Sequence, residues 1–328
     1  MGSARRISIL EHPRCQLGEA PVWCPDDGGA LYWADIFGCT IHRLAMDGAH
    51  RAWATPTRVG ALALHADGGL VAGLKNGIHL LDADADVGGG EPSGGAAGGA
   101  TAAAALRLLV DPEAELPDNR YNDCAVDAAG RLWIGSLDDT GVPGNGALHR
   151  LDADGTATTM VSGVGLANGL GFSPDGTRLY FTDTSARAIH VYDHDPDTGR
   201  LGARRLFARD ADGDGLPDGL AVDAEGHVWS AKFGGGTVVR YRPDGAIERV
   251  QELPVSNPTS VAFGGAALDR LYITTASIDL DDPDELRRGA GQLLVHDDPG
   301  AAGLPARRCE LRPAPVAPSP QSGDLHAA

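Results

Sequence analysis

A short phrase recurs six times along this 328-residue chain, and it constrains the possible folds more than any other feature. In each copy a small or polar residue opens an alternating apolar stretch, a turn follows, and a stretch rich in aromatic or aliphatic residues completes the phrase. The six copies open at Glu19, Gly60, Asn122, Asn168, Asp218 and Thr259. Self-similarity of this kind indicates a repeat architecture, in which each repeat is one unit of supersecondary structure.

A second phrase follows each copy and predicts another short strand, as in Thr40-Ile-His-Arg-Leu44. Several of these strands run into an Asp-Gly pair, namely Asp47-Gly48, Asp154-Gly155 and Asp244-Gly245. An Asp-Gly pair between alternating apolar runs is typical of a tight hairpin turn between antiparallel strands. Each repeat is therefore predicted to form a small antiparallel sheet.

The repeats begin 41 to 50 residues apart, except for one step of 62 residues between Gly60 and Asn122. That step contains residues 88–105, a run rich in Gly and Ala, which we interpret as a flexible insertion in a surface loop. Units of this length with several strands are typical of propeller blades, and the long amphipathic patterns of helical repeats are missing. We therefore predict an all-β fold, a six-bladed β-propeller.

A single domain is predicted over residues 1–328, with the propeller core at about 7–312. The strand-like residues 6–10 are expected to pair with C-terminal strands in one blade and so to close the ring. The final residues, 313–328, are rich in Pro, Ala and Ser and are expected to be disordered. The 46 glycines fit this architecture, because each blade needs several tight turns and such turns favour glycine.

The residues that open the repeats should form a ring around the propeller axis, because equivalent positions of the blades lie at one level. The ring would contain two carboxylates, two carboxamides and one hydroxyl, from Glu19, Asp218, Asn122, Asn168 and Thr259. Oxygen ligands of this kind suit a hard divalent cation such as Ca²⁺, Mg²⁺ or Mn²⁺. They suit Zn²⁺ less well, because zinc prefers nitrogen or sulfur.

The alternative is that these residues only cap turns at the starts of strands, as Asn and Asp commonly do. For any one residue alone we favour that interpretation. For Glu19, Asn168 and Asp218 together we favour a metal site, because separate turn caps have no reason to converge on one axis.

The segment Asp210-Ala-Asp-Gly-Asp-Gly215 resembles the start of an EF-hand calcium loop. Its twelfth position is Ala221, where such a loop requires a bidentate Glu, and no flanking helices are evident. We therefore expect an acidic surface turn here.

Acidic residues outnumber basic residues by 45 to 27, which gives a net charge of −18. This balance argues against nucleic acid and anionic membranes as partners, since both require clustered Lys and Arg. No apolar run approaches the ~18 residues of a membrane span. The five cysteines include no CxxC pair and suit a reducing compartment, so we expect a cytoplasmic protein. We expect a monomer or small homo-oligomer, because a ring closed within one chain needs no partner.

Several motifs occur together between about residues 15 and 297. They are Leu17-Gly-Glu-Ala-Pro-Val-Trp23, Arg120-Tyr-Asn-Asp123 with Asp127-Ala-Ala-Gly-Arg-Leu-Trp133, Ala167-Asn-Gly-Leu170, Pro217-Asp-Gly-Leu220 with Glu225-Gly-His-Val-Trp229, Pro258-Thr-Ser-Val-Ala-Phe263-Gly-Gly265 and Glu285-Leu-Arg-Arg-Gly-Ala-Gly-Gln292. In combination they resemble the regucalcin/gluconolactonase family, also called the senescence-marker-protein family, of six-bladed propeller lactonases.

This resemblance implies roles for five residues. The family positions that match Glu19, Asn168 and Asp218 bind the divalent metal, and the position of Asp218 is also the proposed general base. The positions that match Arg120 and Asn122 hold the substrate.

One departure concerns the acidic residue that contacts sugar hydroxyls in the family, just after the Gly-Ser-Leu stretch. Thr140 is the direct match by count, while Asp138 and Asp139 are adjacent, so which of the three contacts substrate stays open.

The resulting hypothesis is a lactonase that uses one divalent ion (Ca, Zn, Mn or Mg) to hydrolyse a sugar lactone to the aldonic acid. The metal would polarise the carbonyl and acidify a water, and Asp218 would accept the proton of that water. One alternative is a metal-dependent esterase or phosphotriesterase on the same scaffold. The other is a non-enzymatic calcium-binding regulatory protein.

Overall fold

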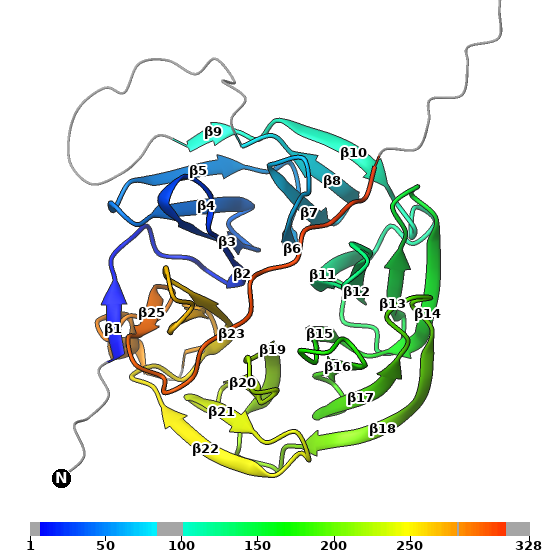
Figure 1. Cartoon of the computed structure of the whole chain (residues 1–328). Coiled ribbons are helices and arrows are strands. Elements are labelled where there is room, and N and C mark those ends of the chain that lie inside the picture. The colour runs from blue at the N-terminus through cyan, green and yellow to red at the C-terminus, as the bar shows by residue number, and fades with distance from the viewer. Residues whose placement is uncertain (1–6, 84–100, 281, 313–328) are drawn as a thin grey trace, which may run out of the picture.

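Six sheets stand as blades around a central axis, so the predicted six-bladed β-propeller is confirmed (Figure 1). The computed structural model describes residues 7–83, 101–280 and 282–312. In each blade the first strand of the repeat lies innermost, and the inner strand of each blade packs against the inner strands of both neighbours. The six residues that open the repeats therefore all lie on strands that line the axis.

The strands follow one another outward within each blade, apart from β1 and β9, which join from elsewhere in the chain. The first three blades contain β2 (Gly18–Cys24), β3 (Ala30–Asp35), β4 (Thr40–Ala45), β5 (His50–Ala54) and β9 (Thr101–Ala103); β6 (Val59–Leu64), β7 (Leu70–Leu74), β8 (Gly77–Leu81) and β10 (Leu106–Val110); and β11 (Asn119–Val126), β12 (Leu132–Asp138), β13 (Gly146–Leu151) and β14 (Ala157–Val164).

The last three blades repeat this pattern. They contain β15 (Ala167–Phe172), β16 (Arg178–Asp183), β17 (Ala188–His194) and β18 (Leu201–Arg209); β19 (Leu216–Val222), β20 (Val228–Phe233), β21 (Thr237–Tyr241) and β22 (Ile247–Glu252); and β23 (Pro258–Gly264), β24 (Arg270–Thr275), β25 (Leu293–His296) and β1 (Ile7–Leu10). Short 3₁₀ helices, η1 (Asp26–Gly28) and η2 (Pro283–Leu286), lie in connecting loops. No helix in the described ranges has the length and apolar character needed to span a membrane.

The ring closes within the last blade, where the N-terminal strand β1 pairs antiparallel with β25, as the sequence predicted. This pairing ties the two ends of the ring together by backbone hydrogen bonds, from Ile7 opposite His296 to Leu10 opposite Leu293.

The predicted flexible insertion over residues 88–105 needs a correction at its C-terminal end. Residues 88–100 lie outside the described part of the chain, but β9 pairs in parallel with the outer strand β5. The Ala104 N–H also donates to the carbonyl oxygen of Ala54 at 2.9 Å. The outer edge of β5 offers unpaired backbone groups, and a run of Thr and Ala can satisfy them without any apolar pattern. The predicted disordered segment, 313–328, lies wholly outside the described residues.

Buried aspartates fix the first turn of two blades. Through Oδ2, Asp127 accepts hydrogen bonds from Nε of Arg131 (2.6 Å) and Nε1 of Trp133 (3.0 Å). Asp223 accepts from Nε1 of Trp229 (2.9 Å) in the same way. The two indoles then pack edge to face on Phe172 and Phe263 of the next blades, with ring centroids 5.9 and 5.7 Å apart. One buried carboxylate thus links the turn, the core and the contact between blades.

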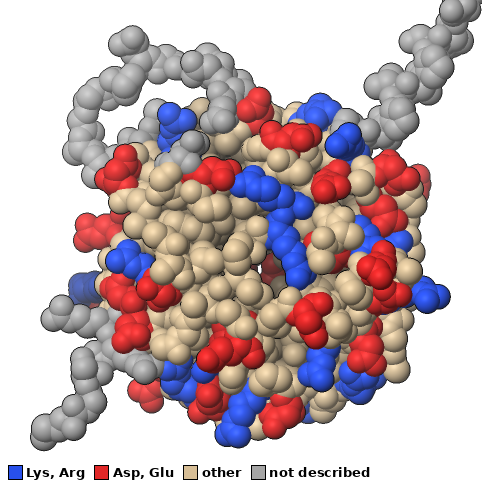
Figure 2. All heavy atoms as spheres, viewed as in Figure 1, with Lys and Arg blue, Asp and Glu red and all other residues tan. Residues whose placement is uncertain are grey.

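A C-terminal segment, residues 299–312, crosses the face where the inner strands end, and we call it the strap (Figure 1). Its backbone bonds to turns of four blades. The four bonds are Ala224 N–H to Ala302 O (2.9 Å), Gly303 N–H to Leu268 O (2.8 Å), Cys309 N–H to Leu64 O (2.7 Å) and Glu310 N–H to Gly130 O (3.0 Å). In Figure 2, which shows this face, one run of basic side chains lies near the middle, and acidic and basic side chains are mixed around the rim.

The turn aspartates give a stability prediction. We expect Asp127→Ala to lower the free energy of unfolding by about 3–5 kcal/mol, because it leaves a buried guanidinium and a buried indole N–H without their acceptor. Urea unfolding followed by circular dichroism measures this loss. Asp244→Ala is the matched control, since the exposed Asp244 accepts the backbone N–H of Ala246 (3.0 Å) in its own turn, and we expect it to lose less than about 1 kcal/mol. Equal losses would contradict the proposed role of Asp127.

Candidate functional site

The inner strands share a local distortion at the residue that opens each repeat. The pairing between the first two strands of every blade slips register there, for example between Glu19 and Val22 and between Asn122 and Cys124. Such β-bulges insert an extra residue and redirect side chains, and they are common next to active sites. After Glu19 the strain is visible, because Ala20 has a φ of 49°, in the left-handed region that non-glycine residues rarely adopt.

Four of the predicted site residues are connected at the axis. The Asn122 amide donates to Oδ1 of Asn168 (3.2 Å) and to the carbonyl oxygen of Ala167 (2.8 Å). Asn168 in turn lies next to Asp218, and its amide opposes a rise in the pKa of that carboxyl. The Arg120 guanidinium donates through Nη1 to Oδ1 of Asn122 at 2.6 Å. The chain of contacts therefore runs from Arg120 to Asp218 across three neighbouring blades.

Glu19 completes the group electrostatically. Burial raises the pKa of Glu19 well above its usual value, and the negative charges of Asp218 and Asp123 raise it further. Burial and Asp123 likewise raise the pKa of Asp218. The structure thus brings Glu19, Asn168 and Asp218 together, as the ring argument expected. Their predicted roles stay predictions.

Asp123 is a third axial carboxylate that sequence reasoning missed. It is the extra residue of the bulge in β11, because the partners of β12 pass from Asn122 directly to Cys124. Asp123 therefore faces the axis together with Asn122, and burial raises its pKa to about 7. An ordinary strand would turn Asp123 away from Asn122, so strand alternation gave no sign of this carboxylate. The available signal was its place in the motif Arg120-Tyr-Asn-Asp123.

The donor set fits a divalent cation. Oδ1 of Asp218 is buried and has no hydrogen-bond partner among the described residues, which is a costly state for a carboxylate oxygen. The three carboxylates repel one another in a desolvated space, and a cation bound between them would remove that repulsion. Two other ring positions offer no free ligand atom, because Gly60 has no side chain and the Thr259 hydroxyl is hydrogen-bonded to the Gly18 carbonyl and to Thr274. Glu19, Asn168 and Asp218 are therefore the residues that could hold the ion.

The Arg120 side chain passes close to the backbone of Gly60 on its way to the site. A Cβ atom at Gly60 would lie 2.9 Å from Nη1 of Arg120 and 2.5 Å from the carbonyl oxygen of Tyr121, so only glycine leaves this path open. On its other side, Nε of Arg120 donates to Oδ1 of Asp139 at 3.0 Å. Arg120 is thereby held between Asp139 and Asn122.

The three candidates for a sugar-binding residue have different surroundings. Asp138 accepts hydrogen bonds from Thr140 and from Asn145, which lower its pKa to about 2 and fix the loop. Asp139 instead pairs with Arg120, Arg58 and Lys75. Burial alone would raise the pKa of Asp139, but these cations hold it below its usual value. Of the three, only Asp139 contacts a predicted substrate-binding residue in the described chain.

A cavity of about 170 Å³ continues along the axis from Asp123 to the strap. Its wall is mostly apolar, with Leu62 and Leu220 among the lining residues, and Ala306 and Arg307 lie at the strap end. Because the strap covers this side, a substrate would approach the carboxylates from the opposite face, where the inner strands begin.

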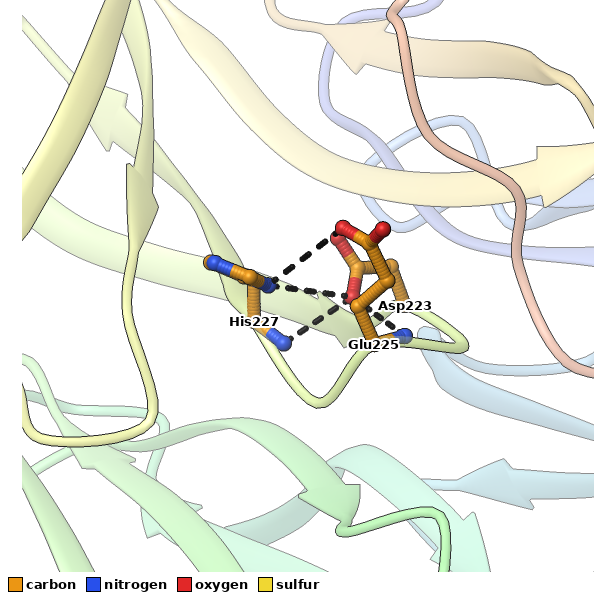
Figure 3. Close-up of side chains that lie close together, drawn as sticks. All are labelled: Asp223, Glu225 and His227. Carbon is orange, nitrogen blue, oxygen red and sulfur yellow. Dashed lines mark hydrogen bonds and ion pairs between the residues drawn. The ribbon is translucent and has the colours of Figure 1, made fainter.

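A second acidic group lies in the first turn of the fifth blade, and Figure 3 shows Asp223, Glu225 and His227 close together. The guanidinium of Arg240 already bonds to Asp223 (2.6 Å) and Glu225 (2.8 Å). Both carboxylates thus already have a cationic partner in Arg240, and the group belongs to the Asp–Trp turn described above. We therefore interpret it as structural.

The EF-hand-like segment is an exposed turn from residue 211 to 214, as expected, but Asp210 is buried. The Lys232 ammonium donates to Oδ2 of Asp210 at 2.7 Å, and the Tyr241 hydroxyl donates to Oδ1 at 3.1 Å. Asp210 is therefore the counterion of a buried lysine, a role that the sequence around it did not indicate.

Comparisons with known proteins agree with this architecture. Residues 17–277 match the family described as SMP-30/Gluconolactonase/LRE-like region. The chain is 38% identical over 304 residues to pentonolactonase XacC of Haloferax volcanii, an alignment that covers 91% of this chain and 96% of that protein. It is 39% identical over 262 residues to a 6-deoxy-6-sulfogluconolactonase of Pseudomonas putida, covering 79% of this chain and 83% of the other.

Among solved structures, a calcium-binding protein, regucalcin, from Agrobacterium tumefaciens superposes with a TM-score of 0.80 at 30% identity. That superposition covers 92% of this chain and 96% of the other. The family match runs from the start of the first blade to the second strand of the last, and it includes every residue of the axial site. The chain therefore belongs to the SMP-30/gluconolactonase family, as its motifs predicted.

Proposed function

We propose that this protein is a lactonase that hydrolyses a sugar lactone to the aldonic acid with one divalent cation held by Glu19, Asn168 and Asp218. The observation that carries the proposal is Oδ1 of Asp218, which is buried among axial carboxylates and has no hydrogen-bond partner in the described part of the chain, in a group that also contains Arg120 and Asn122. Two of the relatives reported above are named as lactonases of sugar acids, which supports the same class of reaction here.

The cation, when bound, would supply a Lewis acid for the lactone carbonyl and would lower the pKa of a water. Asp218 accepts a proton from the attacking water, because its buried Oδ1 has no hydrogen-bond partner among the described residues and is therefore free to take one. Glu19 and Asn168 position the reacting oxygens. Glu19, Asn168 and Asp218 come from the first, fourth and fifth blades, so the arrangement of the blades in the ring sets the distances between them.

Arg120 and Asn122 bind and orient the substrate. The Arg120 side chain is buried and charged, so in this desolvated site it stabilises negative charge that develops on a lactone oxygen. The Asn122 amide donates to Asn168 and to the carbonyl oxygen of Ala167, and its oxygen accepts from Arg120, which fixes the plane of its carboxamide. Asn122 thereby holds Arg120 in place, and a fixed guanidinium loses little freedom when the substrate binds.

Two other functions use the same residues. A metal-dependent esterase or phosphotriesterase would need the same cation and base. A calcium-binding regulatory protein would need only the ion, and the Agrobacterium tumefaciens structure is described as calcium-binding. The pair of Arg120 and Asn122 beside the proposed ion favours an enzyme, because ion binding alone does not require them.

The role of Asp218 gives the first prediction of activity. We expect Asp218→Asn to reduce kcat on aldonolactones by about 10³-fold or more, because the amide cannot accept the proton and weakens ion binding. Hydrolysis is measured by acid release, with circular dichroism to check the fold. Asp214→Asn is the matched control, because Asp214 is exposed four residues earlier and the same change there should leave the rate within about twofold.

The substrate class is tested in the same assay. Chelated protein with Ca²⁺, Mg²⁺, Mn²⁺ or Zn²⁺ restored is given aldonolactones, aryl esters and phosphotriesters. Lactone turnover that follows the restored metal supports the proposal, and turnover only of esters or phosphotriesters would replace it with the second function. Tight ion binding without any turnover would leave the regulatory function.

The raised carboxyl pKa values give a prediction for stability and pH. Without a cation, the Asp123 pKa of about 7 in the folded chain lies above its ordinary value of 3.8, so the folded state binds this proton more tightly. The stabilisation is complete below about pH 4 and is lost as pH rises through about 7. Asp123→Asn should therefore raise the free energy of unfolding of chelated protein at pH 8, by at most about 4 kcal/mol, and change it little near pH 4.

Thermal unfolding of wild-type and Asp123→Asn protein between pH 4 and pH 8 measures this difference. Added divalent cation should reduce this difference at pH 8, because a cation held by Glu19, Asn168 and Asp218 stabilises the ionised Asp123 carboxylate nearby. A difference that does not vary with pH would show that Asp123 does not carry the raised pKa.

A further inference from the structure

Three basic side chains converge on one carboxylate beside the axial site. Nη1 of Arg58 lies 2.7 Å from Oδ1 of Asp139, Nε of Arg120 lies 3.0 Å from the same oxygen, and Nζ of Lys75 lies 3.4 Å from Oδ2. Three positive charges face one negative charge, which leaves an excess of two. Within the described ranges, Asp139 is the only carboxylate in ion-pair distance of Arg58 or Lys75. This local excess is unexpected in a chain with a net charge of −18.

The two cations Arg58 and Lys75 come from adjacent positions of the second blade. Arg58 immediately precedes β6 and Lys75 immediately follows β7, and the Lys75 N–H donates to the carbonyl oxygen of Arg58 at 3.0 Å. The inner strand β6 begins directly after Arg58, so Arg58 lies on the face where the inner strands begin, opposite the strap. The pair therefore borders the face from which a substrate approaches the carboxylates.

Arg58 and Lys75 keep donors that the protein does not use. Arg120 is buried, with hydrogen bonds to Asp139, Asn122 and the carbonyl oxygen of Tyr121. By contrast, the Arg58 and Lys75 side chains are 39% and 31% exposed. Among described residues, the hydrogen bond of the Arg58 side chain is through Nη1 alone.

The Arg58 guanidinium also packs over an aromatic ring. It lies 4.5 Å from the centre of the Phe37 ring, and a cation over an aromatic face is attracted to it. Together with Asp139, this contact restricts the guanidinium before any ligand arrives. A preoriented cation loses less freedom on binding and so favours affinity.

We propose that Arg58 and Lys75 form a subsite for an anionic group on the substrate, at the end away from the lactone carbonyl. This inference rests on the proposed function. A carboxylate, a sulfonate or a phosphate monoester fits, because guanidinium and ammonium groups bind such oxyanions by charge-assisted hydrogen bonds. A neutral sugar offers only hydroxyl groups, which have no need of two excess charges. The subsite also offsets the repulsion that a negative protein exerts on an anionic substrate.

The test compares four lactones that differ only at carbon 6. Glucono-1,5-lactone is the neutral member, and the others carry a carboxylate, a sulfonate or a phosphate there. Wild-type protein, Arg58→Gln, Lys75→Gln and the double variant are assayed for kcat/KM with the restored metal. The matched control is Arg205→Gln, since Arg205 is an exposed cation paired with Asp193 (2.6 Å) on the outer strand β18.

We expect wild-type protein to have a higher kcat/KM for at least one anionic lactone than for the neutral one. Comparison of the three anionic lactones then shows which group the subsite binds. Each single substitution should lower this preference by about tenfold, mainly through KM, and the double variant by more. Arg205→Gln should not change it. A preference that survives in the double variant, or wild-type protein that prefers the neutral lactone, would overturn the proposal.

A binding measurement separates this inference from the proposed function. Calorimetry measures the affinity of the same proteins for glucarate, the open-chain dianion. If no lactone is hydrolysed, the proposed function fails. Weaker glucarate binding by the double variant than by Arg205→Gln would still support the subsite, and equal binding would reject it.

Discussion

Each inner strand slips register at the residue that opens its repeat, and the geometry of the site depends on that slip. In a regular strand, successive side chains face opposite sides, so Asn122 and Asp123 could not both face the axis. The bulge in β11 inserts Asp123 as an extra residue and turns both toward it. The backbone of six blades, rather than any one side chain, therefore places the carboxylates of Glu19 and Asp218 near one another.

The axial carboxylates differ in their surroundings from three other buried acids of the molecule. Asp210 is paired with Lys232, Asp127 with Arg131, and Asp223 with Arg240. At the axis, Glu19 and Asp218 lie near each other and near Asp123. Their raised pKa values reflect the free-energy cost of ionising buried carboxyls beside like charges. That cost opposes folding, and the closed ring, the contacts between blades and the strap offset it. Asp210, Asp127 and Asp223 each have a cationic partner and a structural role, whereas the axial carboxylates gather like charges at the expense of stability, which is why we assign them a function.

The repeats predicted the fold well because each blade is a local unit with its own turn signals, such as Asp244-Gly245. They also predicted that Glu19, Asn168 and Asp218 would share one level, since ring symmetry converts sequence register into position. Asp123 could not be found in this way, because a bulge changes which side a residue faces without changing the apolar pattern. The strap has no alternating pattern at all, and its bonds to turns such as Gly130 exist only once the ring has closed.

Arg120 separates two regions of opposite charge. On one side lie the carboxylates of Glu19, Asp123 and Asp218, and on the other lies the excess positive charge around Asp139. A lactone with a distant anionic group has one favourable orientation in such a field, because the reverse would place that group against the carboxylates. The same division of charge would thus orient the substrate with its lactone carbonyl toward the axial site.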